Sequence, residues 1–189
     1  MNALPRAALL DESSHPPLRV VLGGSLARCS DASFAIRRVR LAGIDLSPAE
    51  LGPLRTCRVL IGRLDAGSLH DVPAGAEARG PALERLLHFA ASGRLSVRSA
   101  PTTGWSPDFS VLQGITSGAG APTSDLCIVG CHYFYEPDPP DGPALTTILT
   151  APAAVQLALR RFDALWASAY DVLPAVAHAL ERLLSIVGP

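Results

Sequence analysis

The order of apolar runs and helix patterns along the chain is the feature that most constrains its fold. Several short apolar runs end at a glycine or a polar residue, which is typical of buried strands. They lie at 33–41, 57–62, 94–99, 108–114, 126–130 and 145–150. Helix patterns separate them, most clearly over 80–93 and after residue 150. Strands that alternate with helices pack in layers, so the sequence predicts an α/β fold, a layered α-β-α domain around a central mixed sheet.

The first half of the chain carries local signals for its boundaries. Residues 1–16 are expected to form a flexible N-terminal arm with a short helix at 3–10, and residues 17–189 to form one domain, since 189 residues suit a single core. A helix is expected over 18–29. Ser47 can cap a second helix that begins at Pro48, and Glu50 completes a capping box.

The second half of the chain predicts two long helices. Thr150 is expected to cap the first, which has Pro152 near its start. Its apolar residues recur at i, i+4, i+7 and i+11 and form one stripe. They are Val155, Leu159, Phe162 and Trp166. Asp171 is expected to cap the last helix, which ends at Val187.

Charge and hydropathy exclude several classes of function. All 16 cationic side chains are arginines, so no mechanism of this protein uses a lysine amine. The net charge of −1 provides no long-range attraction for nucleic acid or an anionic membrane. No apolar run reaches the roughly 18 residues that a membrane helix needs. Only 17% of residues are charged and the mean hydropathy is +0.27, which predicts a buried interface with another subunit.

The four cysteines favour reduced thiols over disulfides. Cys29, Cys57, Cys127 and Cys131 are not spaced as a disulfide framework, and a cytoplasmic location is therefore expected. Cys127, Cys131 and His132 have no evident fourth partner for a zinc site. No metal and no other cofactor is expected.

Four stretches of the chain carry a resemblance to a known superfamily. They are SDASFAIRRVRLAGIDL, CRVLIGRLD, ALERLLHFAASGRLSVRSA and LTTILTAPAAVQLALRRFDALWASAYDV. In this order and spacing they resemble a single-copy domain of the phospholipase D-like superfamily, over roughly residues 18–175. The resemblance implies a phospholipase D-like fold and a His-x-Lys motif, in which the histidine becomes phosphorylated and the lysine holds phosphate oxygens. It also implies a later Gly-Ser-x-x-Asn strand, and two such sites facing each other across a dimer.

The positions that match these motifs carry other residues. In WSPDFSVLQG, Ser106 stands at the histidine position and Asp108 at the lysine position; in IVGCHYF, only the glycine is kept. The degenerate site comprises Ser106, Asp108, Gly130, Cys131, His132 and Phe134. Phosphoryl transfer requires positively charged groups beside the negative phosphoryl oxygens, and an aspartate reverses the sign of the group at that place. The resemblance therefore implies a domain without catalytic residues.

Two pairs of residues are further candidates for reactive groups. Cys131 and His132 would form a thiolate–imidazole pair, but neighbours on a strand point to opposite faces, which favours a buried cysteine and a surface histidine. Asp108 and Asp125 would form a carboxylate pair, and the simpler interpretation is two separate strand ends. The proline-rich segment 136–143 is either a contact surface or a tolerated insertion.

The arginine clusters raise a nucleic-acid hypothesis, because guanidinium groups match phosphate geometry. The candidates are Arg37, Arg38, Arg40, Arg160 and Arg161. Aromatic residues are only 5% of the chain, which argues against stacking on single strands.

Three functions follow from these patterns. The first is an inactive phospholipase D-like domain that serves as an interaction or regulatory subunit of a bacterial multiprotein system, with DNA processing or defence as the setting suggested by analogy. It would form a homodimer or a complex with an active partner protein, away from membranes. The alternatives are a nucleic-acid-binding module and an enzyme with new chemistry at Ser106, Asp108 or His132.

Overall fold

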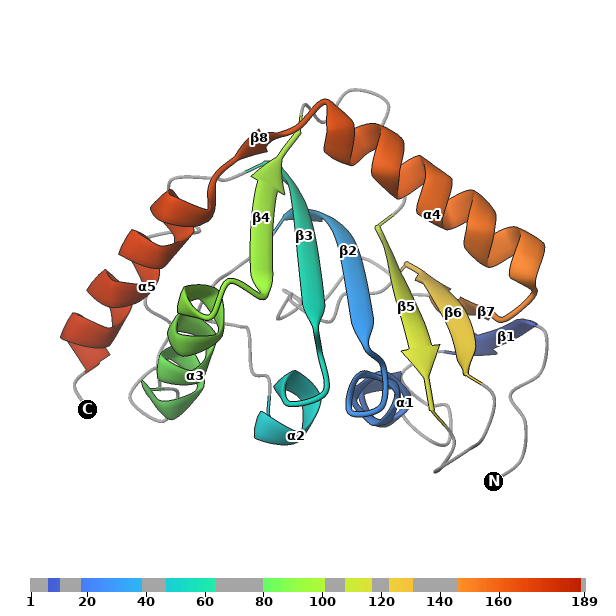
Figure 1. The fold of residues 1–189 in the computed structure, drawn as a ribbon, viewed down its shortest axis with the longest axis horizontal. Coiled ribbons are helices and arrows are strands. Elements are labelled where there is room, and N and C mark those ends of the chain that lie inside the picture. The colour runs from blue at the N-terminus through green and yellow to red at the C-terminus, as the bar shows by residue number, and fades with distance from the viewer. Residues whose placement is uncertain are drawn as a thin grey trace.

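The central sheet contains eight strands in the part of the chain that the structure, a computed structural model, describes: residues 7–10, 18–38, 47–63, 80–100, 108–116, 123–130 and 146–187. Their order across the sheet is β1-β7-β6-β5-β2-β3-β4-β8 (Figure 1). In that order they span Ala7–Leu10, Thr146–Leu149, Ser124–Val129, Phe109–Ile115, Asp31–Arg38, Thr56–Arg63, Leu95–Ser99 and Tyr170–Asp171. β2, β3 and β4 pair in parallel, and the other pairings are antiparallel. The sheet is therefore mixed, as predicted.

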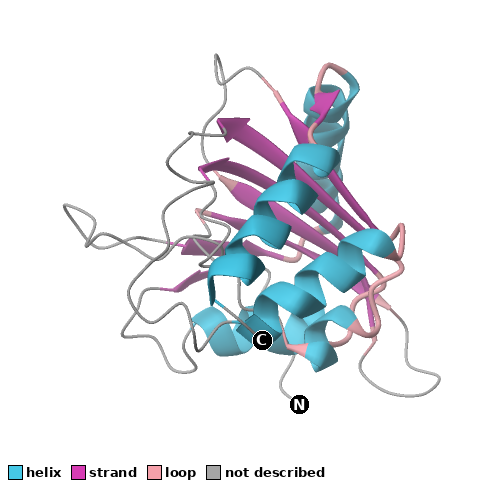
Figure 2. Ribbon diagram, turned by 90° about the vertical axis from the view of Figure 1, so that its left-hand side faces the viewer, coloured by secondary structure: helices cyan, strands magenta, loops and turns pink. Residues whose placement is uncertain are grey.

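Helices lie against both faces of this sheet (Figure 2). They are α1 (Leu18–Leu26), α2 (Pro48–Leu51), α3 (Gly80–Ala91), α4 (Pro152–Ala167) and α5 (Leu173–Val187). α1, α2, α3 and α5 share one hydrophobic cluster with one face of the sheet, whereas α4 packs alone into a second cluster on the other face. This confirms the predicted α-β-α layers.

The two clusters follow from the alternation of side chains along each strand. On β2, Phe34 and Ile36 are buried in the larger cluster, and Ala35 between them belongs to the α4 cluster. The predicted stripe on α4 is confirmed. Val155 and Phe162 are almost completely buried, and Leu159 and Trp166 pack beside them.

Several predicted boundaries hold because local hydrogen bonds set them. Ser47 and Glu50 form the capping box, and the helix that they begin has only four residues. The Asp171 carboxylate accepts a hydrogen bond from the N–H of Leu173, at 2.9 Å, although Asp171 itself lies in β8. None of the described helices is long and apolar enough to cross a membrane.

Two local predictions are wrong. Residues 7–10 do not belong to a helix but form β1, which pairs with β7 from Ala7 opposite Leu149 to Leu10 opposite Thr146. An isolated helix of eight residues is unstable, and the edge of the sheet offers these residues better partners. Thr150 does not cap α4 either, because the cap residue is Ala151 and no side chain caps it. The division of the chain at residue 17 stays a prediction.

Candidate functional site

The ends of two strands and the starts of two others meet where the sequence places the degenerate site. β5 runs antiparallel to β6, so that Asp108, just before β5, lies beside Gly130, just after β6. Arg37 lies near the end of β2, next to the start of β5. Thr146 begins β7 and donates its hydroxyl to the carbonyl of Gly130, at 3.3 Å. The fold thus brings Asp108 and Gly130 together, as the resemblance implies.

Within the described residues, the Asp108 carboxylate is held by Arg37. Its carboxylate Oδ1 accepts hydrogen bonds from the backbone N–H of Arg37, at 3.1 Å, and from the Arg37 Nε, at 3.0 Å. Asp108 is only 7% exposed, whereas the Arg37 side chain is 48% exposed. The Asp108 carboxylate is therefore paired with a guanidinium group inside the protein.

Gly130 fixes the end of β6. Its φ of +84° lies in the left-handed region that side-chain-bearing residues rarely adopt. In this conformation its N–H donates to the backbone carbonyl of Asp108, at 2.7 Å. The glycine that the sequence keeps therefore shapes the backbone at this end of the sheet.

Most of the other predicted site residues belong to segments that the structure does not describe. Ser106, Arg40, Cys131, His132, Phe134 and the segment 136–143 lie outside the described residues, as does the side chain of Arg38. Arg160 and Arg161 are exposed on α4.

Asp125 is not paired with Asp108. Asp125 lies at the other end of β6, where its Oδ1 accepts from the Gly114 N–H, at 2.9 Å. The carboxylate-pair hypothesis is therefore wrong, because antiparallel pairing of β5 and β6 places these two side chains at opposite ends of the strands.

The cysteines within the described residues are structural. Cys29, Cys57 and Cys127 are free and buried. Burial raises the pKa of the Cys29 and Cys57 thiols to about 12 and that of Cys127 to about 11. Thiols of this kind stay protonated at neutral pH and are poor nucleophiles. Across the described ranges, no three side chains of the metal-binding types cluster together.

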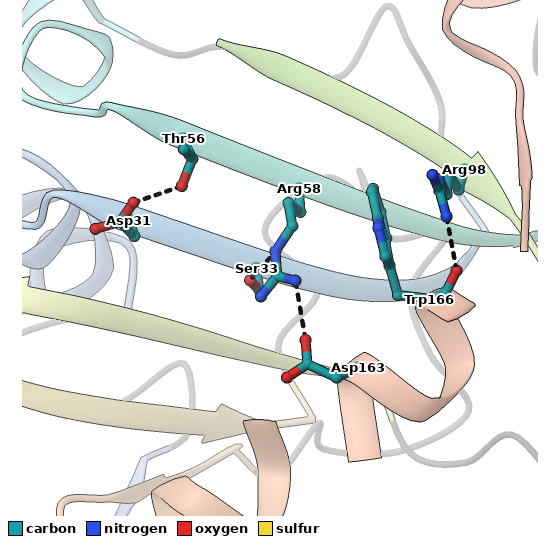
Figure 3. A network of polar contacts seen from close by, with 7 residues as sticks. All are labelled: Asp31, Ser33, Thr56, Arg58, Arg98, Asp163 and Trp166. Atoms are coloured by element: carbon teal, nitrogen blue, oxygen red, sulfur yellow. Dashed lines mark hydrogen bonds and ion pairs between the residues drawn. The ribbon is translucent and has the colours of Figure 1, made fainter. Parts of the chain in front are cut away.

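A second polar cluster lies between the sheet and α4, and the sequence analysis missed it (Figure 3). Arg58 on β3 donates from Nε to the Ser33 hydroxyl, at 3.2 Å, and from Nη1 to the Asp163 carboxylate on α4, at 2.9 Å. Its guanidinium lies over the ring of Phe162, 4.7 Å from the centroid. The only sequence signal was the polar side chains at alternate positions on β2 and β3, which is also typical of an ordinary solvated face.

A second arginine extends the same cluster. The guanidinium of Arg98 lies 4.8 Å from the ring centroid of Trp166 and donates to the Trp166 carbonyl, at 3.1 Å. Trp166 in turn stacks on Phe162, with 5.5 Å between the ring centroids. The guanidinium groups of two arginines on the sheet thus contact the two stacked rings of α4. These contacts hold α4 on the sheet in addition to its apolar stripe.

Comparison with known proteins identifies likenesses in fold alone. No protein-family model matches the sequence, and no curated protein matches it. A similar fold occurs in TrmBL2, an archaeal chromatin protein with a novel mode of DNA binding, at a TM-score of 0.51 and 11% identity. A similar fold also occurs in the polyphosphate kinase of Porphyromonas gingivalis, at a TM-score of 0.52 and 12% identity. Nuc from Salmonella typhimurium, a phospholipase D family member, matches at a TM-score of 0.47 and 12% identity.

The lengths that these matches cover differ widely. The matches cover 91% of this chain and 56% of TrmBL2, 86% of this chain and 26% of the polyphosphate kinase, and 88% of this chain and 98% of Nuc. This chain therefore spans about half of TrmBL2 and a quarter of the kinase. The layered architecture recurs in both as a part of a longer protein.

The role of Asp108 generates a stability prediction. Asp108→Ala removes the acceptor for two Arg37 donors, so the free energy of unfolding should fall by about 1–3 kcal/mol. Asp108→Asn keeps an oxygen acceptor and should lower the free energy of unfolding by less than Asp108→Ala does. Urea denaturation followed by circular dichroism measures the difference. Asp163→Ala, which removes an exposed partner of Arg58, is the control and should cost about 0–1 kcal/mol. An unchanged midpoint for Asp108→Ala would contradict this structural role.

Proposed function

We propose that this chain is a phospholipase D-like domain without phosphodiesterase activity, and that it acts as an interaction or regulatory subunit of a bacterial multiprotein system. The observation that carries the proposal is the Asp108 carboxylate, buried and ion-paired with Arg37 at the position that matches the superfamily's lysine. The likeness to Nuc is too distant to add to this argument.

Electrostatics gives the reason why the superfamily's reaction would fail here. A lysine about 4 Å from a phosphoryl oxygen contributes attraction on the order of 4 kcal/mol at a near-surface dielectric. A carboxylate at that place repels the phosphoryl group by a similar amount. Arg37 balances the carboxylate, but its Nε is used in doing so, and the balanced pair attracts phosphate far less than a free lysine. The sequence has no lysine to substitute.

The surface supports a role in association. Large apolar side chains that are more than half exposed occur on four different elements. They are Val20 on α1, Leu157 on α4, Tyr170 on β8 and Ile186 on α5. In a chain with few charges these side chains favour a homodimer or a complex with an active partner protein. A role of that complex in DNA processing or defence rests on analogy with the superfamily.

The first test is an assay for phosphodiester hydrolysis. The purified protein should cleave neither bis(p-nitrophenyl) phosphate nor DNA above the rate in buffer, with or without divalent cations, while an active His-x-Lys nuclease serves as positive control. Cleavage that disappears in Ser106→Ala or His132→Ala would contradict the proposal. It would instead support an enzyme with new chemistry at this site.

The second test is the mass in solution. Light scattering should give a mass of at least twice the 19.7 kDa of one chain, or a stable complex with a co-purified protein. Leu157→Glu and Tyr170→Glu place charges on two of the exposed apolar positions, and at least one of them should shift the mass toward the monomer. A clean monomer without a partner at micromolar concentrations would count against the subunit role.

Nucleic-acid binding is the second candidate function. TrmBL2, which shares the fold, is a chromatin protein that binds DNA, and Arg160 and Arg161 are exposed on α4. One observation opposes nucleic-acid binding at the cluster of Arg37, Arg38 and Arg40. The Nε of Arg37 already donates a hydrogen bond to the Asp108 carboxylate.

Salt dependence separates this candidate from the first. If Arg37, Arg38 and Arg40 contact three phosphates of duplex DNA, the logarithm of affinity should fall against the logarithm of salt with a slope near −2.7, about −0.9 for each contact. Changing all three to alanine should flatten the slope and weaken all sequences alike. Arg182→Ala, which alters one exposed arginine on α5, is the control. If the triple variant binds as well as the parent, or if neither binds, these arginines serve the fold or an interface.

A further inference from the structure

A polar groove opens on the α4 face of the sheet, at the end away from Asp108. It has a volume of about 360 Å³. Its lining comprises Asp31, Ser33, Thr56, Cys57, Arg58, Gly93, Arg94, Ser96 and Gln113. Along β5, Gln113 follows Asp108 by five residues, which corresponds to about 17 Å at roughly 3.4 Å per residue. The groove is therefore separate from the degenerate site.

Strand register arranges the polar side chains of the groove in two rows. Gln113, Asp31 and Thr56 are direct neighbours across β5, β2 and β3, and Ser33, Arg58 and Ser96 are direct neighbours across β2, β3 and β4. Alternate residues of a strand face the same side, so both rows lie on the face that α4 covers further along the strands. Six polar side chains from four strands thus form one continuous surface.

Most of the unused hydrogen-bonding capacity in this surface consists of donors. The Gln113 amide and the Ser96 hydroxyl make no side-chain hydrogen bond to the rest of the described chain. The Ser33 oxygen accepts from Arg58 Nε, which leaves its own proton to donate. Within the same ranges, Arg58 uses Nε and Nη1 but not Nη2. A ligand that supplies several acceptor oxygens would satisfy these groups.

The charges of the lining also favour an anion. Two guanidinium groups belong to lining residues, Arg58 and Arg94, and a third, that of Arg55, acts on Asp31. They outnumber the two carboxylates nearby, which are Asp31 in the lining and Asp163, paired with Arg58 at 2.9 Å. Arg94 also donates to the Leu54 carbonyl and lies over the ring of Phe89. Burial of Asp31 opposes its ionisation, but hydrogen bonds from Ser30 and Thr56 and the charges of Arg55 and Arg58 outweigh burial and lower its pKa. Asp31 therefore stays ionised at neutral pH and can accept hydrogen bonds from ligand hydroxyls.

We propose that this groove binds a small hydroxyl-rich molecule that carries a phosphate, that is, a sugar phosphate or a similar phosphorylated polyol. The phosphate would lie against Arg58 and the exposed Ser96, where the guanidinium can donate a charge-assisted hydrogen bond, while the buried Ser33 holds Arg58 in place. The hydroxyls would lie against Asp31 and Gln113. The volume is within the usual range for small-molecule sites, and the described lining residues include no aromatic side chain that would stack on a nucleobase.

Calorimetric titration with glucose 6-phosphate tests the proposal, with glucose, inorganic phosphate and adenosine monophosphate as comparison ligands. Glucose 6-phosphate should bind more tightly than each of these. Ser96→Glu adds a carboxylate at an exposed position and should weaken binding by about tenfold or more, equivalent to about 1.4 kcal/mol. Gln113→Ala should lower the affinity for glucose 6-phosphate but leave the affinity for inorganic phosphate unchanged.

Two controls keep the result interpretable. Arg58→Gln removes the central guanidinium, and its thermal unfolding must be compared with the parent, because Arg58 also contacts α4. Ser96→Glu carries the test if Arg58→Gln unfolds. Arg182→Gln removes an exposed arginine on α5 and should leave binding unchanged.

Four outcomes would overturn the proposal. They are no heat of binding for glucose 6-phosphate, equal affinity for inorganic phosphate, binding that Ser96→Glu does not weaken, and displacement of the ligand by duplex DNA. The last would assign the groove to nucleic acid. None of these outcomes bears on phosphodiester hydrolysis, so this test and the tests of the proposed function fail independently.

Discussion

The packing of α4 on one half of a sheet face is the constraint on which the rest of the structure depends. Phe162 is fully buried against Ala35, Leu60 and the other members of its cluster. One helix cannot cover eight strands, and the other four described helices all lie on the opposite face. The uncovered half must therefore be polar, and β2 and β3 change from Ala35 and Leu60 to Ser33 and Arg58 within one step along the strands. The groove lies on the part of this face that α4 leaves uncovered.

At the opposite end of the strands, the main electrostatic feature is the buried carboxylate of Asp108. A buried carboxylate is costly unless it is paired, and Asp108 has both a backbone N–H and a guanidinium from Arg37. This arrangement stabilises the junction of β2, β5 and β6, and the bond from Gly130 to the Asp108 carbonyl closes it. Here the pairing is already complete, which suits a structural role.

The sequence predicted what is encoded locally and missed what depends on contacts between distant residues. The capping box at Ser47 and the stripe on α4 follow from spacings of three and four residues, and both were predicted. β1 pairs with a strand more than 130 residues away, and no local pattern identifies that partner. The bond between Arg37 and Asp108 spans 71 residues, so each was assigned a separate role. The groove requires the register of four strands, which a single sequence does not provide.

The exclusive use of arginine has structural consequences beyond composition. The guanidinium of Arg58 lies over Phe162, that of Arg94 over Phe89 and that of Arg98 over Trp166, each less than 5 Å from the ring centroid. A planar guanidinium can stack on a ring and still donate hydrogen bonds from its edge, which the compact ammonium of lysine does less well. Arg58 uses its edge for Ser33 and Asp163 while its face rests on the helix. The same side chain thus joins α4 to the sheet and forms one wall of the groove, so a lysine at this position would keep the charge and lose the connection.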